Sequence, residues 1–254
     1  MRSVTLLLPA LNESRNIVSL IESAGELARS GRLGPGVRVR MILVDDGSAD
    51  GTGEAAGNVR GAPEVLIVTH PRTLGLGCAV RSGLARFLKD RPDPIEDCLC
   101  VMDADGSHPP GLIALMAEKL GQGAGLVVAS RYAEGGKEVG VSVPRRIMSR
   151  TANGLLKILF PMAGIRDYTS GFRLFRAEAI ERLSRKTGGR FFREDGFAST
   201  PELLLGMRSL GIRGEEVPLV LRYDLKRGPS KMKAGRTILR YLILMARMKL
   251  FLAE

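Results

Sequence analysis

The stretch Val101-Met-Asp103-Ala-Asp105-Gly-Ser-His108 leads an apolar run directly into two carboxylates that stand two positions apart. The tripeptide Pro109-Pro-Gly111 follows and does not allow a strand to continue. The pattern predicts a buried strand that ends at Asp103 and Asp105. In open α/β sheets, ligands bind at the carboxyl ends of the strands. The stretch therefore predicts a ligand site as well as a strand.

Two acidic side chains this close repel each other, and a cation between them is the simple way to keep both ionised. Hard oxygen ligands suit Mg²⁺ or Mn²⁺, which proteins usually share with a substrate phosphate. A polar turn after a strand explains the same residues without any ligand. The rest of the chain has to decide between these two interpretations.

Apolar runs that alternate with helical patterns extend on both sides of this stretch. Short buried strands are predicted at residues 4–9, 37–44, 65–69, 98–102 and 126–130. Helical patterns between the strands are typical of βαβ units, so we expect an α/β fold with a mostly parallel central sheet flanked by helices. Residues 1–132 resemble a nucleotide-binding half-sheet.

The pattern changes after residue 132. An amphipathic helix is predicted over residues 145–160, because basic and apolar side chains separate onto two faces at helical pitch. The other elements expected here are a loop at 134–137, a turn into a strand at 167–173, a helix at 201–210, a final strand within 212–221 and an apolar helix at 237–252.

Composition limits the class of protein. A chain of 254 residues with 44% hydrophobic residues fits one large α/β domain or one domain with an appendage. The cysteines Cys78, Cys98 and Cys100 lie among apolar residues without metal-type spacing, which favours a reducing compartment over a disulfide framework. The first apolar run is too short for a signal peptide, and no uncharged run reaches the ~18 residues of a spanning helix.

The net charge of +11 is unevenly distributed. Residues 222–254 hold nine Lys or Arg and two acidic residues, which predicts an anionic partner such as lipid headgroups, phosphates or nucleic acid. A basic stripe is formed by Lys233, Arg236, Arg240 and Arg247. Trp is absent and apolar residues crowd the stripe, so a helix on an anionic membrane, or one packed on the sheet, is favoured over nucleic-acid binding.

A second acidic strand end strengthens the prediction of a ligand site. Asp45-Asp46-Gly47-Ser48 follows the second predicted strand and would line the same edge of the sheet. A carboxylate there can accept hydrogen bonds from a nucleotide base, although Asp is also a common turn former. Two acidic strand ends together are harder to explain as turns than one.

Competing motifs are missing from the sequence. The first strand ends in Pro-Ala-Leu-Asn-Glu without the glycine turn of a dinucleotide fingerprint, and no Gly-Lys-Ser/Thr phosphate loop is present. The histidines, His70 and His108, lack a third nitrogen or sulfur ligand nearby, which disfavours a zinc enzyme.

Seven short motifs, in this order, resemble the family 2 glycosyltransferases with a GT-A fold, and within them the polyprenyl-phosphate (dolichol-phosphate) mannosyltransferase branch. The motifs are Pro9-Ala-Leu-Asn-Glu13, Val44-Asp-Asp-Gly-Ser48, Asp103-Ala-Asp105, Ser130-Arg-Tyr132, Asp167-Tyr-Thr-Ser-Gly-Phe-Arg173, Glu216-Val-Pro218 and Gly228-Pro-Ser-Lys231. The resemblance implies a GT-A domain over residues 1–232, with a nucleotide-sugar half (1–132) and an acceptor half (133–232). A basic amphipathic helix over 233–254 would follow.

The resemblance also implies roles for single residues on the donor side. Asp103 and Asp105 would hold Mg²⁺ or Mn²⁺, and the metal would hold the sugar diphosphate. Arg131 and Lys231 would reach the diphosphate or the acceptor. The remaining nucleotide-sugar contacts would come from Pro9, Leu11, Glu13, Val44, Asp45, Asp46 and Ala104.

On the acceptor side, Arg145 and Ser149 stand where this branch binds the acceptor phosphate, at the start of the predicted amphipathic helix. Asp105 and Arg131 would act in catalysis, and Asp195 is the carboxylate nominated if a general base is required. The sequence departs from the family pattern at Leu11, where an aromatic residue is usual, and elsewhere at a few motif positions.

The expected function is an inverting, metal-dependent transfer of a hexose, with mannose favoured, from a nucleotide sugar, with GDP-mannose favoured, to a polyprenyl or dolichyl phosphate. The enzyme would be cytoplasmic and peripheral on an anionic membrane surface. The sequence leaves open whether a small membrane-anchoring subunit exists. Nucleic acid is not an expected partner. One alternative is a soluble family 2 transferase that uses a UDP-sugar and a glycan or small-molecule hydroxyl. Another is a non-catalytic nucleotide-sugar-binding subunit.

Overall fold

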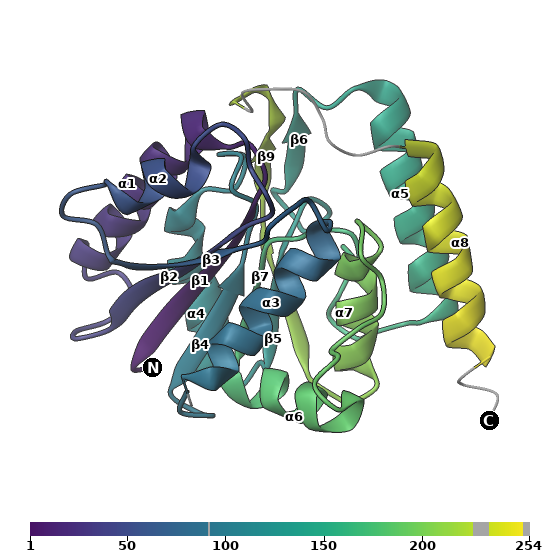
Figure 1. The fold of residues 1–254 in the computed structure, drawn as a ribbon. Coiled ribbons are helices and arrows are strands. Elements are labelled where there is room, and N and C mark those ends of the chain that lie inside the picture. The colour runs from purple at the N-terminus through teal and green to yellow at the C-terminus, as the bar shows by residue number, and fades with distance from the viewer. Residues whose placement is uncertain (91, 226–233, 251–254) are drawn as a thin grey trace.

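The computed structural model describes residues 1–90, 92–225 and 234–250. Its centre is a seven-stranded sheet with helices on both faces (Figure 1). The strands of this sheet are β1 (Ser3–Ala10), β2 (Arg38–Asp45), β3 (Glu64–Thr69), β4 (Asp97–Val101), β5 (Leu126–Ser130), β7 (Arg173–Arg176) and β8 (Gly214–Pro218). A separate two-stranded sheet pairs β6 (Lys137–Val139) with β9 (Val220–Arg222).

The helices of the described chain are α1 (Ser14–Arg29), α2 (Thr52–Gly57), α3 (Leu76–Lys89), α4 (Ile113–Gly121), α5 (Val143–Leu159), α6 (Ala177–Thr187), α7 (Ser199–Arg208) and α8 (Ala234–Leu250). Short 3₁₀ turns occur at Pro110–Leu112 and Tyr223–Leu225. The predicted helices lie within two or three residues of α5, α7 and α8. Helix α6 and the strand pair β6–β9 are additions that the sequence patterns do not predict.

Two apolar cores lie on the two faces of the central sheet. On β1, Leu6 and Leu8 belong to the core under α1, α2 and α4, whereas Leu7 belongs to the core under α3, α6 and α7. Strands of a mostly parallel sheet are buried on both faces, so they appear as continuous apolar runs in the sequence. Each fully buried leucine contributes roughly 1.5–3 kcal/mol of transfer free energy.

The strand order is β3-β2-β1-β4-β7-β5-β8, and all pairings are parallel except those of β7. The predicted α/β fold with a mostly parallel sheet is therefore confirmed. Strand β7 separates β4 from β5, so the turn that precedes it lies at the carboxyl edge of both neighbours: Val101 pairs with Arg173. This insertion brings residues 167–172 next to the segments that follow β4 and β5.

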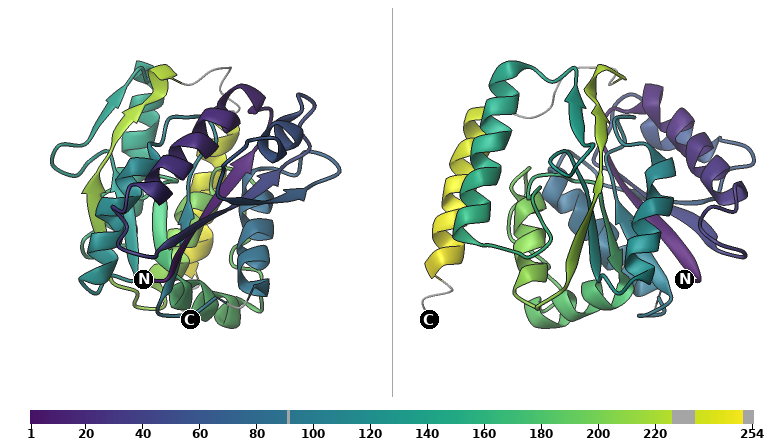
Figure 2. Two further views of the ribbon diagram at one scale, coloured as in Figure 1. Left: turned by 90° about the vertical axis from the view of Figure 1, so that its left-hand side faces the viewer. Right: turned by 180° about the vertical axis from the view of Figure 1, so that it is seen from behind.

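Helices α5 and α8 lie side by side at one end of the molecule (Figures 1 and 2). Tyr241, Leu244 and Met245 of α8 are buried in the same core as Ala152 and Leu156 of α5. The C-terminal helix is thus packed into the body of the protein. In the part of the chain that the structure describes, every helix is too short or too polar to cross a membrane.

Candidate active site

A cleft of about 560 Å³ opens at the carboxyl edge of the central sheet. It brings together nine residues that the sequence nominates for the site: Pro9, Leu11, Glu13, Asp46, Asp103, Ala104, Asp105, Arg145 and Asp195. Four other nominated residues, Val44, Asp45, Arg131 and Ser149, are not part of its lining. The nominated Lys231 lies outside the described residues.

The acidic pair follows β4 in a turn that is held by its own side chains. Asp105 is buried, and one of its carboxylate oxygens accepts hydrogen bonds from the Ser107 backbone N–H at 3.1 Å and hydroxyl at 2.5 Å. The backbone N–H of Asp103 donates to Nδ1 of His108 at 3.0 Å, and the His108 ring stacks on Phe172. The Ser107 contacts therefore hold Asp105, and the side chain of Asp103 is 47% exposed and lines the cleft.

The donor chemistry of this turn fits a hard divalent cation. Asp103 and Asp105 offer carboxylate oxygens on one side of the cleft. Within residues 1–90, 92–225 and 234–250, no group of three or more His, Cys, Asp or Glu side chains is placed to hold a metal. Mg²⁺ and Mn²⁺ are commonly held by one or two carboxylates together with water and substrate phosphate oxygens. Metal binding by this pair stays a prediction.

Asp46 organises the neighbouring wall of the cleft. Its two carboxylate oxygens accept hydrogen bonds from the backbone N–H groups of Leu74 at 2.9 Å and Gly75 at 2.8 Å. Nδ1 of His70 lies 2.7 Å from the same carboxylate. Because the Asp46 carboxylate accepts these hydrogen bonds within the protein, it holds the loop that leads into α3 in place. A direct contact of Asp46 with a nucleotide base stays a prediction.

The two preceding residues of the same strand end are placed differently. Val44 is fully buried in the core under α3. Asp45 caps the following turn, since its carboxylate accepts the backbone N–H of Ser48 at 2.9 Å. The turn interpretation therefore describes Asp45, whereas Asp46 lines the cleft.

The loop of residues 193–198 also lines the cleft and is hydrogen-bonded to the start of α3. The backbone N–H of Gly77 donates to the carbonyl of Asp195 at 2.7 Å. A Cβ at Gly77 would lie 2.0 Å from the carbonyl oxygen of Glu194, so only glycine allows this approach. Arg81 pairs with the Asp195 carboxylate and lowers its pKa, which makes Asp195 a weak proton acceptor.

The cleft is lined by Arg145 and by further basic side chains that the sequence does not assign to the site. They are Arg193, which follows no recognisable motif, and Arg236 and Arg240 of α8. Arg145 donates to the Tyr223 hydroxyl at 2.5 Å and lies over the Tyr223 ring. The lining of the cleft thus combines the two carboxylates that follow β4 with arginines from α5, α8 and the loop before α7.

The basic stripe of α8 lies partly along the cleft. Arg236 and Arg240 face the cleft, and Arg247 donates to Glu202 at 2.7 Å and lies 3.4 Å from Glu194. Arg247 is therefore paired with buried carboxylates, whereas Arg236 and Arg240 are exposed at the cleft. The helical spacing of the basic residues can be seen in the sequence, but the sequence does not show which way that side of the helix faces.

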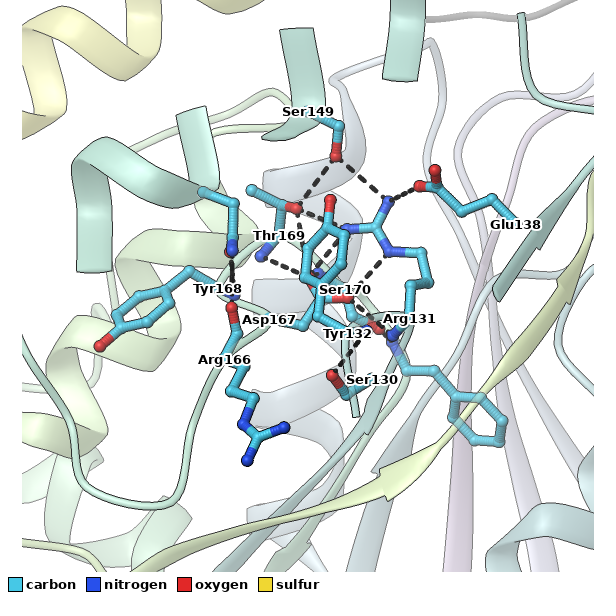
Figure 3. A network of polar contacts seen from close by, with 12 residues as sticks. Ser130, Arg131, Tyr132, Glu138, Ser149, Arg166, Asp167, Tyr168, Thr169 and Ser170 are labelled. Atoms are coloured by element: carbon cyan, nitrogen blue, oxygen red, sulfur yellow. Dashed lines mark hydrogen bonds and ion pairs between the residues drawn. The ribbon is translucent and has the colours of Figure 1, made fainter. Parts of the chain in front are cut away.

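Arg131 lies at the centre of a buried polar network (Figure 3). Its Nε and Nη2 groups each donate to Asp167 at 2.8 Å, and Nη1 donates to Glu138 at 3.0 Å and to Ser149 at 3.2 Å. Nη2 also donates to Thr169 at 2.6 Å. All five N–H groups of the guanidinium are thus bonded within the protein.

Electrostatics keep this network ionised. Burial disfavours the charge on Arg131, but the adjacent Asp167 outweighs burial and raises the pKa of the guanidinium. Burial likewise opposes the charge on Asp167, and Arg131 holds the pKa of that carboxyl below its usual range. In this arrangement Arg131 joins the end of β5 to the turn before β7. The contact of Arg131 with a diphosphate or with the acceptor substrate stays a prediction.

Comparison with known proteins gives concordant matches. The family model described as Glycosyl transferase family 2 matches residues 5–184. The chain is 29% identical over 241 residues to the dolichol-phosphate mannosyltransferase of Pyrococcus furiosus, which covers 94% of this chain and 61% of that protein. It is 33% identical over 180 residues to the polyprenol monophosphomannose synthase of Mycolicibacterium smegmatis, which covers 70% of this chain and 63% of that protein.

The fold is also similar to that of a solved mannosyl-3-phosphoglycerate synthase from Rubrobacter xylanophilus. The TM-score is 0.60 with 16% sequence identity, over 96% of this chain and 73% of that one. The matches with the two relatives span less than two thirds of their lengths. The family match covers well over half of the chain and confirms the resemblance and the GT-A type of fold. The chain belongs to glycosyl transferase family 2.

Proposed function

We propose that this member of a glycosyltransferase family moves a hexose, with mannose favoured, from a nucleotide sugar to a polyprenyl phosphate at a membrane surface. The names of two relatives describe mannosyl transfer to dolichol phosphate and synthesis of polyprenol monophosphomannose. The observation that carries the proposal is the charge pattern of the cleft. Asp103 and Asp105 line the cleft together with Arg145, Arg193 and Arg240.

The acidic side of the cleft suits the donor. Pro9 near the end of β1, and Leu11 and Glu13 after it, line the cleft together with Asp46 and would bind the nucleoside. Leu11 offers aliphatic contact to a base in place of stacking. Mg²⁺ or Mn²⁺ held by Asp103 and Asp105 would neutralise the charge that develops on the departing nucleoside diphosphate. GDP-mannose is the favoured donor.

The basic side suits an acceptor that is itself an anion. A phosphate monoester has a second pKa of about 6, so its attacking oxygen is already charged near neutral pH. Such an acceptor needs positioning rather than a general base, and Arg145 at the cleft can supply it through charge-assisted hydrogen bonds. The lowered pKa of Asp195 agrees with a reaction that does not depend on that carboxylate as a base. Displacement in line with the leaving group would invert the anomeric centre.

The outer faces of α5 and α8 suit a membrane surface. Apolar side chains that are exposed on these two adjacent helices are Val143, Ile147, Leu155, Ile158, Leu239, Leu242, Ile243 and Leu250. Arg150, Lys157 and Lys249 are exposed on the same helices. An apolar face flanked by basic side chains is the composition of a helix that lies in an anionic membrane interface. A lipid phosphate would then approach the cleft from the side of Arg145.

The test is a transfer assay with labelled nucleotide sugars, Mn²⁺ and a short polyprenyl phosphate, followed by organic extraction. We expect label from GDP-mannose in the organic phase, lost in Asp105→Asn and retained in Glu118→Gln, which removes an exposed carboxylate on α4 away from the cleft. Label that stays in a water-soluble product from a UDP-sugar would support the alternative transferase. Nucleotide-sugar binding without transfer to any acceptor would support a binding subunit.

A further inference from the structure

Two buried polar atoms beside Arg131 face each other without completing a hydrogen bond. In the described part of the chain, Glu138 Oε2 and Arg146 Nε are both buried and lack a hydrogen-bond partner. They lie 3.6 Å apart, which is an ion-pair distance but too long for a hydrogen bond. Buried charged groups normally satisfy their hydrogen bonds, so this gap calls for a functional explanation.

The two carboxylates around Arg131 differ in how firmly they are held. Asp167 is fully buried and also accepts the backbone N–H groups of Arg131 at 3.1 Å, Thr169 at 3.2 Å and Ser170 at 3.0 Å. Glu138 is bonded through Oε1 to Arg131, while its other oxygen is unsatisfied. Asp167 is therefore the fixed partner of the guanidinium, and Glu138 is the exchangeable one.

The backbone supports the same distinction. Asp167 precedes β7 in the middle of the central sheet, whereas Glu138 lies on β6, a strand of three residues that pairs with β9 outside that sheet. Moving Glu138 away from Arg131 leaves the ladders of the central sheet intact. Its side chain is only 5% exposed, so an anion can reach Arg131 from this side only when the carboxylate moves.

The groups around Glu138 would suit a larger anion. Arg131 Nη1 donates to both Glu138 and Ser149, so the Ser149 hydroxyl borders the position of the carboxylate. Arg146 approaches the same carboxylate from the first turn of α5, and its neighbour Arg145 lines the cleft. A phosphate monoester in place of the carboxylate could bond to two guanidinium groups and one hydroxyl, and could satisfy the Nε of Arg146.

We propose that the Glu138 carboxylate occupies the position of the acceptor phosphate in the unbound protein and is displaced when that phosphate binds to Arg131, Arg146 and Ser149. The inference rests on the proposed function, since it takes the acceptor to be a phosphate monoester. Both anions cannot share these cations without strong repulsion, so binding of one requires departure of the other. Glu138 thereby sets the affinity for the acceptor and keeps Arg131 ordered in its absence.

The first test compares Glu138→Gln with Glu134→Gln, which removes an exposed carboxylate from the same connection. We expect Glu138→Gln to lower the KM for a short polyprenyl phosphate at least about threefold, with the KM for the nucleotide sugar unchanged. Glu134→Gln should leave both values unchanged. An unchanged or raised acceptor KM in Glu138→Gln would show that the carboxylate only orients Arg131 and would overturn the proposal.

The second test needs no transfer activity and so separates this inference from the proposed function. Inorganic phosphate is titrated into the protein without donor, and binding is followed by calorimetry. We expect tighter binding to Glu138→Gln than to the wild type, and weaker binding to Arg146→Gln, with Arg150→Gln on the exposed face of α5 as the control. Equal phosphate affinity in the wild type and Arg146→Gln would refute the site even if Glu138→Gln proved too unstable to purify.

Discussion

Arg131 and Asp167 form a buried ion pair in which Nε and Nη2 of the arginine each lie 2.8 Å from a different carboxylate oxygen of the aspartate. The pair connects the segment after β5 to the turn before β7, which are 36 positions apart in the chain. Two of the short motifs in the sequence, Ser130-Arg-Tyr132 and the segment that starts at Asp167, are thus halves of one structural unit (Figure 3).

Removing one member of this pair should destabilise the fold strongly. Asp167→Asn leaves the Arg131 charge buried without its fixed partner, and we expect a loss of about 3–5 kcal/mol in the free energy of unfolding, measured by urea denaturation. Glu181→Gln breaks a surface pair between a half-buried Glu181 and the exposed Arg185 one helical turn away, and should cost less than about 1 kcal/mol. Similar losses in both variants would contradict the structural role of the buried pair.

Ser107 should tune the proposed metal site through Asp105. Its hydroxyl and backbone N–H both donate to one oxygen of that carboxylate, so Ser107→Ala removes one of the bonds that orient it. We expect Ser107→Ala to weaken Mn²⁺-dependent binding of GDP about 10–100-fold in calorimetry, as is usual for a group that orients a metal ligand. Ser184→Ala on α6, far from the acidic pair in the chain, serves as the control and should bind GDP like the wild type.

The arginines that α8 contributes to the cleft should bind a phosphate-bearing substrate. We expect Arg240→Gln to lower kcat/KM about tenfold, because charge-assisted hydrogen bonds are worth more than neutral ones. Lys89→Gln removes a positive charge from an exposed position at the end of α3, outside the lining of the cleft, and should have little effect. Raising the ionic strength should shrink the difference between Arg240→Gln and the wild type, and a difference independent of salt would argue against an electrostatic role.

The stability of the protein should fall between pH 4 and pH 2 in part because of Asp50. Burial opposes its charge, but hydrogen bonds from Thr52 and Ser14 outweigh burial and lower the pKa of Asp50 to about 2. An unfolded aspartate titrates near pH 3.9, so the stabilisation is present above that value and is lost as the pH falls through the folded pKa. Asp50→Asn should give a flatter dependence of the thermal midpoint on pH in this window, and an unchanged slope would contradict the assignment.

The parts of the site that can be predicted from the sequence are those whose residues are adjacent in the chain. Asp103 and Asp105 directly follow a buried strand, so their place at the carboxyl edge follows from the strand itself. The insertion of β7 between β4 and β5 depends on pairing between segments about 75 positions apart, for which the sequence carries no local signal. The pairing of Arg131 with Asp167 follows from that insertion and could not be predicted without it.

The same reasoning applies to α8. Its amphipathic pattern predicts a helix with two faces, but a periodic pattern does not say which face meets the protein. In the structure Arg247 pairs with Glu202 and Arg240 lines the cleft, whereas the apolar side chains of Leu239 and Leu242 are exposed. Carboxylates on α7 and its preceding loop, distant in the sequence, decide the orientation.

That orientation leads to a prediction for membrane binding. Ile158 of α5 is the most exposed large apolar side chain of the described chain, at 78%, and it lies on the helix that runs beside α8. Ile158→Glu removes apolar contact and adds a charge that anionic lipids repel, so we expect affinity for vesicles containing anionic lipids to fall about tenfold or more in a co-sedimentation assay. Ile95→Glu is the matched control, because Ile95 is 64% exposed in the connection before β4, on neither α5 nor α8. Equal losses of vesicle binding in the two variants would mean that α5 and α8 do not form the membrane-binding surface of the protein.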